Sequence, residues 1–132
     1  MPLDQAEANR LLNAMLGKAA YTAPTTPMRG RLMSANGSAS ANGTEVVNAG
    51  GSAYTAQDVS TALPASGTNG VITNTSAITY TNMPAITTVG VEVWDSAGTP
   101  RRALYGSLTA SKTTALGDSL TIAPSALVLN MV

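Results

Sequence analysis

The sequence predicts a mainly β protein, and three observations lead to this fold class. Pairs of turn-forming residues recur along the chain, at 36–37, 42–43, 50–51, 69–70 and 117–118. Short segments rich in β-branched and apolar residues lie between these turns. Several of them alternate apolar with small or polar residues, as a strand with one buried face does. Together these observations predict an antiparallel β-sandwich or jelly-roll-like domain, with a small closed barrel as the alternative.

The composition narrows the classes of function. The chain has 132 residues, which is enough for one core, and its seven basic and seven acidic residues cancel. This balance disfavours nucleic acid as a partner. Because Cys and His are absent, we expect no zinc or copper site and no cofactor. Because the N-terminus lacks a basic signal-peptide start and no apolar run could span a bilayer, we expect a soluble protein, made in the cytoplasm, without a membrane partner.

The N-terminal segment predicts a short α-helix followed by a proline-rich extended arm. Asp4 can act as the N-cap, Glu7 stands three residues later as in a capping box, and Gly17 supplies the stop. Pro24 and Pro27 then favour extended backbone. The apolar residues recur at spacings of three and four, at Ala8, Leu11, Leu12, Met15 and Leu16.

This helix has two interpretations. Its apolar face either packs on the core of its own domain or docks on a neighbouring molecule. We therefore divide the chain into a helix and extended arm at residues 1–27 and a β-sandwich domain at residues 28–132. Within that domain we predict strands at roughly 28–34, 53–63, 77–80, 89–95, 103–108, 119–122 and 127–132.

The segment SANGSASANGTEVVNAGGSAY is rich in Gly, Ser and Asn, as a flexible linker is. Linkers seldom interrupt a domain of this size. We therefore interpret it as a pair of tight turns around a short edge segment at 45–47.

The stretch WDSAGTPRR, residues 94–102, predicts a β-hairpin. Val89, Val91 and Val93 give the preceding strand one aliphatic face, and the residues after the turn alternate again. Trp94 suits either a protein interface or the edge of the domain's own core.

Acidic residues are the remaining candidates for chemistry. Glu92, Asp95 and Asp118 lie in the predicted sheet region, and two carboxylates are able to hydrolyse a glycoside. Ordinary structural roles explain them better, because Asp95 can cap the hairpin turn and Asp118 follows Gly117 in another turn. With no Cys or His to build a nucleophile and base pair, we expect no enzyme activity.

Arginines could form a small basic patch if their strands are neighbours. The pairs are Arg29 with Arg31 and Arg101 with Arg102. Without aromatic stacking platforms such a patch binds nucleic acid weakly. We expect these arginines to pair with Glu92, Asp95 or the acids of a neighbouring subunit.

Several segments together carry a family resemblance that covers most of the chain: the N-terminal helix, AYTAPTTP, NMP at 82–84, WDSAGTPRR and GDSLTIA. In these segments the chain resembles a family of small virion proteins of tailed phages that infect actinobacteria. Members are labelled tail fibre-like, minor capsid or head decoration proteins. The resemblance implies a structural virion protein. We expect a capsid decoration protein that stabilises the outer surface of the major capsid shell.

Decoration proteins of this kind commonly form trimers that clamp adjacent major capsid subunits. The partners implied are therefore the major capsid protein and further copies of this chain, at the capsid surface. The alternative is a tail fibre or tail-tip protein that binds the host surface. The candidate contact residues are Leu11, Leu12, Met15, Trp94, Arg101 and Arg102.

Overall fold

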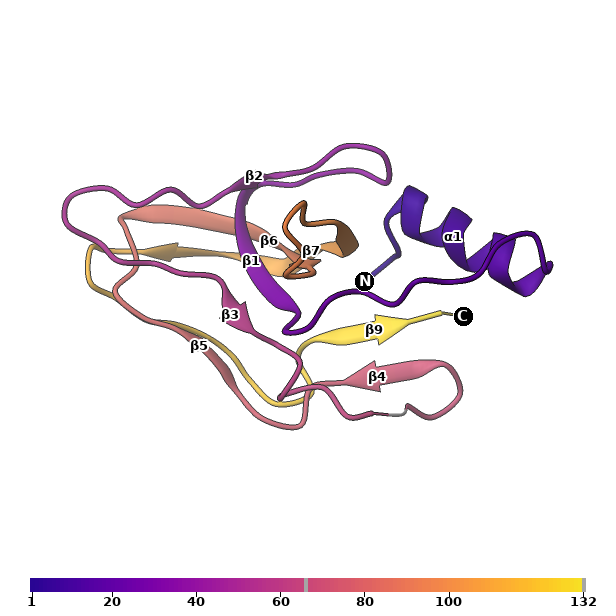
Figure 1. The fold of residues 1–132 in the computed structure, drawn as a ribbon. Coiled ribbons are helices and arrows are strands. Elements are labelled where there is room, and N and C mark those ends of the chain that lie inside the picture. The colour runs from indigo at the N-terminus through magenta and orange to yellow at the C-terminus, as the bar shows by residue number, and fades with distance from the viewer. Residues whose placement is uncertain (66, 132) are drawn as a thin grey trace.

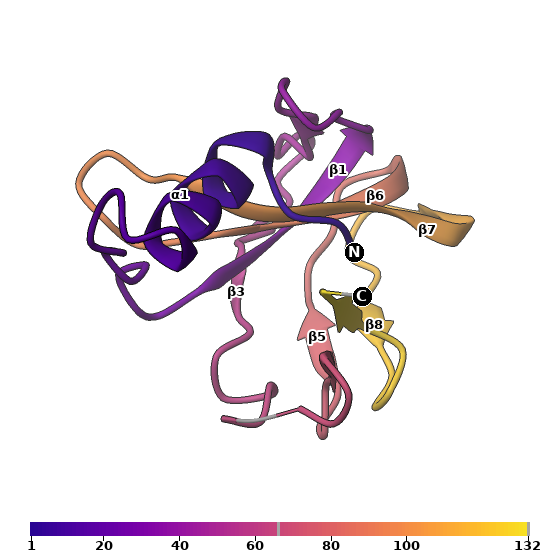
Figure 2. The ribbon, with the colours of Figure 1, turned by 90° about the vertical axis from the view of Figure 1, so that its right-hand side faces the viewer.

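A computed structural model describes residues 1–65 and 67–131, and shows one helix and several antiparallel sheets (Figure 1). The elements in chain order are α1 (Gln5–Met15), β1 (Arg29–Ala35), β2 (Thr44–Glu45), β3 (Gln57–Asp58), β4 (Val71–Thr73), β5 (Ile78–Tyr80), β6 (Ile86–Trp94), β7 (Arg102–Thr114), β8 (Leu120–Ile122) and β9 (Val128–Asn130). Figure 2 shows α1 on one side of the long strands, with β3, β5 and β8 on the other.

The main sheet has five strands. Four follow the order β2-β1-β6-β7, and the fifth, β3, pairs with β1 on the same edge as β2. On that edge β2 pairs near the end of β1, at Met33 and Ala35, and β3 pairs at its start, at Arg29 and Gly30. Two small sheets, β4-β9 and β5-β8, complete the sandwich. The prediction of a mainly β, antiparallel sandwich-like domain is confirmed. No strand pairing within the described residues joins β7 to β8, so these sheets do not close into the barrel that was the alternative.

The core lies between the main sheet and the small strands. Leu32, Val91 and Val93 point to this side, as the alternation of the sequence predicts. Tyr54 and Tyr80 stack with ring centroids 6.0 Å apart. Both hydroxyls are satisfied, because that of Tyr80 donates to the carbonyl of Gly30 (3.0 Å) and that of Tyr54 accepts from the N–H of Leu32 (2.8 Å). Burial raises the pKa of both phenols.

Most predicted strands are present. Where a strand is shorter than predicted or was not predicted, a turn or a pairing between distant segments explains the difference. The predicted strand at 53–63 shortens to Gln57–Asp58, because the Asp58 carboxylate accepts the N–H of Ser60 (2.8 Å) and turns the chain. The predicted edge segment at 45–47 forms at Thr44–Glu45, and the last strand covers Val128–Asn130, with residue 132 outside the described residues. We did not predict β4, which pairs with the distant β9.

Both ends of α1 follow the prediction. An oxygen of Asp4 accepts the N–H of Ala6 (2.8 Å), and Gly17 adopts a φ of +67° after the last turn. The expected capping box is wrong, because the N–H of Asp4 donates to the carbonyl of Ala103 (2.9 Å) and Glu7 turns towards the sheet. In the described part of the chain, no helix has the length and apolar character needed to cross a membrane.

Residues 1–27 run along the body and are hydrogen-bonded to it. Leu3 forms a bridge with Leu104, and the carbonyl of Pro2 accepts the N–H of Tyr105 (3.2 Å). Further along, the carbonyl of Thr25 accepts the N–H of Ser96 in the turn between β6 and β7 (2.9 Å). The arm therefore covers the first part of the β7 edge and the neighbouring turn.

Candidate interaction surface

The predicted hairpin at residues 94–102 is confirmed. β6 ends at Trp94, β7 begins at Arg102, and the N–H of Asp95 donates to the carbonyl of Arg101 (3.0 Å). Burial alone would raise the pKa of Asp95, but hydrogen bonds from the N–H groups of Arg101, Thr25 and Ala97 outweigh burial and lower it. The Asp95 side chain therefore holds the turn and the arm together, as a capping acid does.

Arg102 is buried at the centre of an ion-pair network on the helix side of the sheet. Its guanidinium donates to the carboxylates of Asp4 (2.7 Å) and Glu92 (2.7 Å) and to the carbonyls of Ser38 (2.6 Å) and Ala41 (2.9 Å). The pairing that we expected with Glu92 is confirmed. Burial works against the charge, but the bonds to Asp4 and Glu92 raise the pKa of Arg102.

This network leaves Arg102 no role at an outer surface. A guanidinium has five N–H donors, and the side chain of Arg102 also donates from Nε to Asp4 (3.0 Å), so all five are used inside the molecule. Glu92 is equally engaged, because it also accepts from the N–H of Gly43 (2.8 Å) and from Nε1 of Trp94 (3.0 Å). Arg102 therefore positions the arm and the 36–43 loop on the sheet.

A second buried acid, Glu7, fastens α1 to the hairpin. Its carboxylate lies 2.8 Å from Arg10 and 3.5 Å from Nε of Arg101, and it accepts the hydroxyl of Tyr21. Arg101 lies 3.8 Å from Asp95 as well, the other acid with which we expected it to pair. Burial and the bond to Glu7 raise the pKa of Tyr21 to about 12.

Three large apolar residues at the C-terminal end of α1 and its cap face away from the body. Leu12 is 53% exposed, Met15 81% and Leu16 69%, whereas Leu11 is half-buried. These three exposed residues, called the apolar stripe below, stand at i, i+3 and i+4 and so share one helix face. The only fully buried residue of α1 is the acid Glu7. The interpretation in which this face packs on its own core is therefore wrong for the apolar stripe.

Trp94 contacts Arg31 and Glu92 on the main sheet and is not part of the apolar stripe. Its ring is half-buried, with the guanidinium of Arg31 4.5 Å from the ring centroid and its N–H bonded to Glu92. Arg31 itself pairs with Glu45 (3.5 Å). Sequence reasoning missed Asp4, Glu7 and Tyr21 as partners of the arginines, because they lie far from the hairpin along the chain and no local pattern links them.

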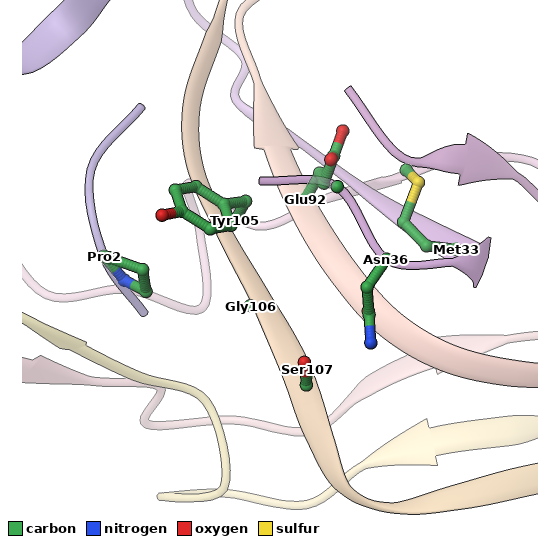
Figure 3. A pocket seen from close by; sticks show the side chains of 8 residues that line it. Pro2, Met33, Asn36, Glu92, Tyr105, Gly106 and Ser107 are labelled. Carbon is green, nitrogen blue, oxygen red and sulfur yellow. The ribbon is translucent and has the colours of Figure 1, made fainter. Parts of the chain in front are cut away.

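A pocket of about 200 Å³ lies on the helix side of the sheet. Figure 3 shows Pro2, Asn36 and Tyr105 around it. Its one acid, Glu92, is already held by Arg102. The Asp118 carboxylate is engaged too, because it accepts the N–H of Ala115 (2.8 Å) and closes a turn as expected. Among the described residues there is no group of three or more acids that could hold a metal ion.

Comparison with known families identifies the chain as a structural protein of a bacteriophage virion. Residues 3–130 match the family model described as podophage GP4 fiber I protein gp80, and the chain belongs to this family. No curated protein matches the chain. The match confirms the resemblance to phage virion proteins, while the actinobacterial host and the place in the particle stay predictions of the sequence.

Proposed function

We propose that the protein is a fibre component of the virion that attaches to another virion protein through the apolar stripe of α1. One observation carries this proposal: Leu12, Met15 and Leu16 point outward while the acid Glu7 points inward. An exposed apolar patch of this kind marks an interaction site, since water contact at such a patch is unfavourable. The family's description as a fibre protein supports the fibre role.

The apolar stripe suits docking into a groove. Its spacing matches the way an amphipathic helix anchors in an apolar groove, and each fully buried Leu or Met contributes about 1.5–3 kcal/mol. The contacts of Glu7 with Arg101 (3.5 Å) and Tyr21 hold α1 in place before binding, which lowers the entropic cost of association. In this proposal residues 1–27 are the attachment arm, and residues 28–132 form the outer body that meets the host surface. The protein acts by binding, without catalysis.

Capsid decoration is the second candidate. The resemblance to a family whose members are also labelled minor capsid or head decoration proteins favours it, and the apolar stripe would then dock on the outer surface of the major capsid protein, with the protein as a trimer. Copy number separates the two candidates. Quantitative mass spectrometry of purified virions should find few copies per particle for a fibre and hundreds for a decoration protein.

A double substitution tests the attachment site itself. We expect L12Q with M15Q to lower the amount of protein in purified virions by more than about a hundredfold, because two anchors lose their apolar contacts. The melting temperature of the free protein should stay unchanged, since both side chains are exposed. The matched control is N13Q, which changes an exposed polar residue of the same helix. Normal incorporation of the double variant would contradict the proposal.

A further inference from the structure

The large apolar side chains that are exposed among the described residues lie in three places. Leu12, Met15, Leu16 and Tyr21 belong to α1 and the chain after it, Val47 and Leu116 lie in two loops, and Val128 and Met131 lie in and just after β9. Figure 1 shows α1 at the right-hand end of the molecule, and the loop after β2 with the chain after β7 at the left-hand end. Two of the three apolar surfaces therefore lie at opposite ends of the molecule.

The surface opposite α1 is built from two loops that touch. Leu116 lies beside the backbone of Gly50, since a Cβ on that glycine would be 3.5 Å from a methyl group of Leu116. Val47 is exposed in the same loop as Gly50. Asp118 ends the turn that carries Leu116, and its carboxylate accepts the N–H of Ala115 (2.8 Å). Val47, Leu116 and Asp118 are called the distal patch below.

The two ends of the molecule carry opposite free charges. Asp118 is the one exposed acid of the chain, because the other six acids are buried or half-buried. Lys18 is exposed two residues after the apolar stripe. Neither forms an ion pair with any described residue. The distal patch and the end of α1 are therefore complementary both in apolar character and in charge.

The other exposed surfaces do not offer this combination. Lys112, a second exposed cation without an ion pair in the described part of the chain, lines the groove of about 510 Å³ between β7 and β8. Its neighbours along β7 are exposed Ser and Thr side chains. The apolar surface at Val128 and Met131 has no acid in its stretch of chain, residues 119–131. Charge therefore selects the distal patch as the match for the apolar stripe.

A two-fold contact between two stripes would leave Lys18 without an acid. Such a contact sets α1 against α1, and the two acids near the start of this helix are Asp4 and Glu7. Within one chain, Arg102 holds Asp4 (2.7 Å) and Arg10 holds Glu7 (2.8 Å). An end-to-end contact instead brings Lys18 to the free carboxylate of the distal patch. The charges therefore favour contact between unlike surfaces.

We propose that the apolar stripe of one copy docks on the distal patch of a second copy, so that copies join end to end. The proposal rests on the proposed function, because it names a partner for the same stripe. Val47 and Leu116 pack against the stripe, and Asp118 pairs with Lys18. A contact between unlike surfaces repeats along a row of copies. The first copy of the row keeps a free stripe, which attaches the row to the particle.

Two variants, each with one intact end, test the contact in the purified full-length protein. L12Q with M15Q keeps the distal patch, and V47Q with L116Q keeps the stripe; all four side chains are exposed, so the melting temperature should not change. In sedimentation experiments the wild type and N13Q should associate as the concentration rises. Each double variant alone should stay monomeric, and an equimolar mixture of the two should form one-to-one dimers and nothing larger.

Three results of that experiment would overturn the proposal. Dimers of V47Q with L116Q alone would show that a stripe binds a stripe. A mixture of the two double variants that stays monomeric would show that the stripe and the distal patch do not meet. A wild type that stays monomeric up to about 1 mM would show that copies do not associate.

The ion pair is tested by a cycle of substitutions. K18E should weaken the association more than about tenfold, since it sets a like charge against Asp118, whereas K18R should associate normally. D118N keeps an oxygen for the N–H of Ala115 but loses the charge. In that background K18E should change the affinity by no more than about twofold. Equal losses in the two backgrounds would overturn the pairing of Lys18 with Asp118.

Incorporation into virions separates this proposal from the proposed function. A wild type that stays monomeric, together with poor incorporation of L12Q with M15Q, would overturn the end-to-end contact and leave the attachment role of the stripe standing. End-to-end association in solution, together with normal incorporation of that variant, would contradict the attachment role alone.

Discussion

The two faces of the main sheet are built from different chemistry. One face buries Leu32, Val91 and Val93 against the small strands. The other buries Glu92 and Arg102 beneath the arm and the 36–43 loop. Apolar burial depends on shape and volume alone, whereas a buried charge needs each partner at the right distance and angle. The core face should therefore tolerate conservative change, and the charged face should not.

Glycine lets the loop approach the charged face. A Cβ on Gly37 would lie 2.6 Å from a Glu92 oxygen, and one on Gly43 would lie 2.6 Å from the carbonyl of Ala35. Only the absence of a side chain permits these approaches. The loop that resembles a linker in the sequence is thus a fixed part of the buried network.

The largest expected effect comes from R102A. It leaves Glu92 and Asp4 without their main partner, so we expect a loss of about 3–5 kcal/mol in the free energy of unfolding, measured by urea denaturation. The control R31A removes a more exposed arginine, whose ion pair with Glu45 contributes no more than about 1 kcal/mol. Equal losses in the two variants would break the contrast between buried and exposed charge.

A conservative substitution should cost less unfolding free energy on the core face than on the charged face. We expect L32M, which keeps the volume of a core side chain, to cost less than about 1.5 kcal/mol. E92Q keeps the shape but weakens the bonds to Arg102 and Gly43, so it should cost about 1.5–3 kcal/mol. Urea denaturation of both variants measures the difference. A greater loss in L32M than in E92Q would contradict the comparison.

The smallest effect concerns pH. Folding lowers the pKa of Asp95, so its ionised carboxylate stabilises the folded state. This stabilisation is complete above the unfolded pKa of about 4 and is lost as the pH falls through the lowered pKa. Folding raises the pKa of Tyr21 to about 12, so its contribution is present below about pH 10 and is lost between pH 10 and 12. Melting temperatures of the wild type and Y21F across pH 9–12 measure the second effect. A constant difference over that range would show that Tyr21 does not titrate there.

Local sequence patterns predicted several elements well. Asp4 and Gly17 marked the ends of α1, and the alternation at 89–93 with the turn after Trp94 gave the hairpin. These features depend on residues close together in the chain, so propensity and spacing suffice. The short β4 was missed because three residues give little periodic signal and its partner lies far away in the sequence.

The candidate interaction surfaces were predicted only in part. The sequence showed that Leu12 and Met15 share one helix face, but it left open whether that face is buried. No sequence pattern predicted the groove between β7 and β8. Such a groove forms where two strands do not pair, and strand pairing depends on the whole fold.

By itself the sequence determined the fold class, the helix with its ends and the hairpin, because short-range sterics, capping and period-two burial act within a few residues. Only the tertiary structure decided which way α1 faces. That orientation depends on Glu7 meeting Arg101 across the fold, and on Arg102 joining Asp4 to Glu92. Such bonds require atoms far apart in the chain to come within a few ångströms, and no local rule encodes that distance.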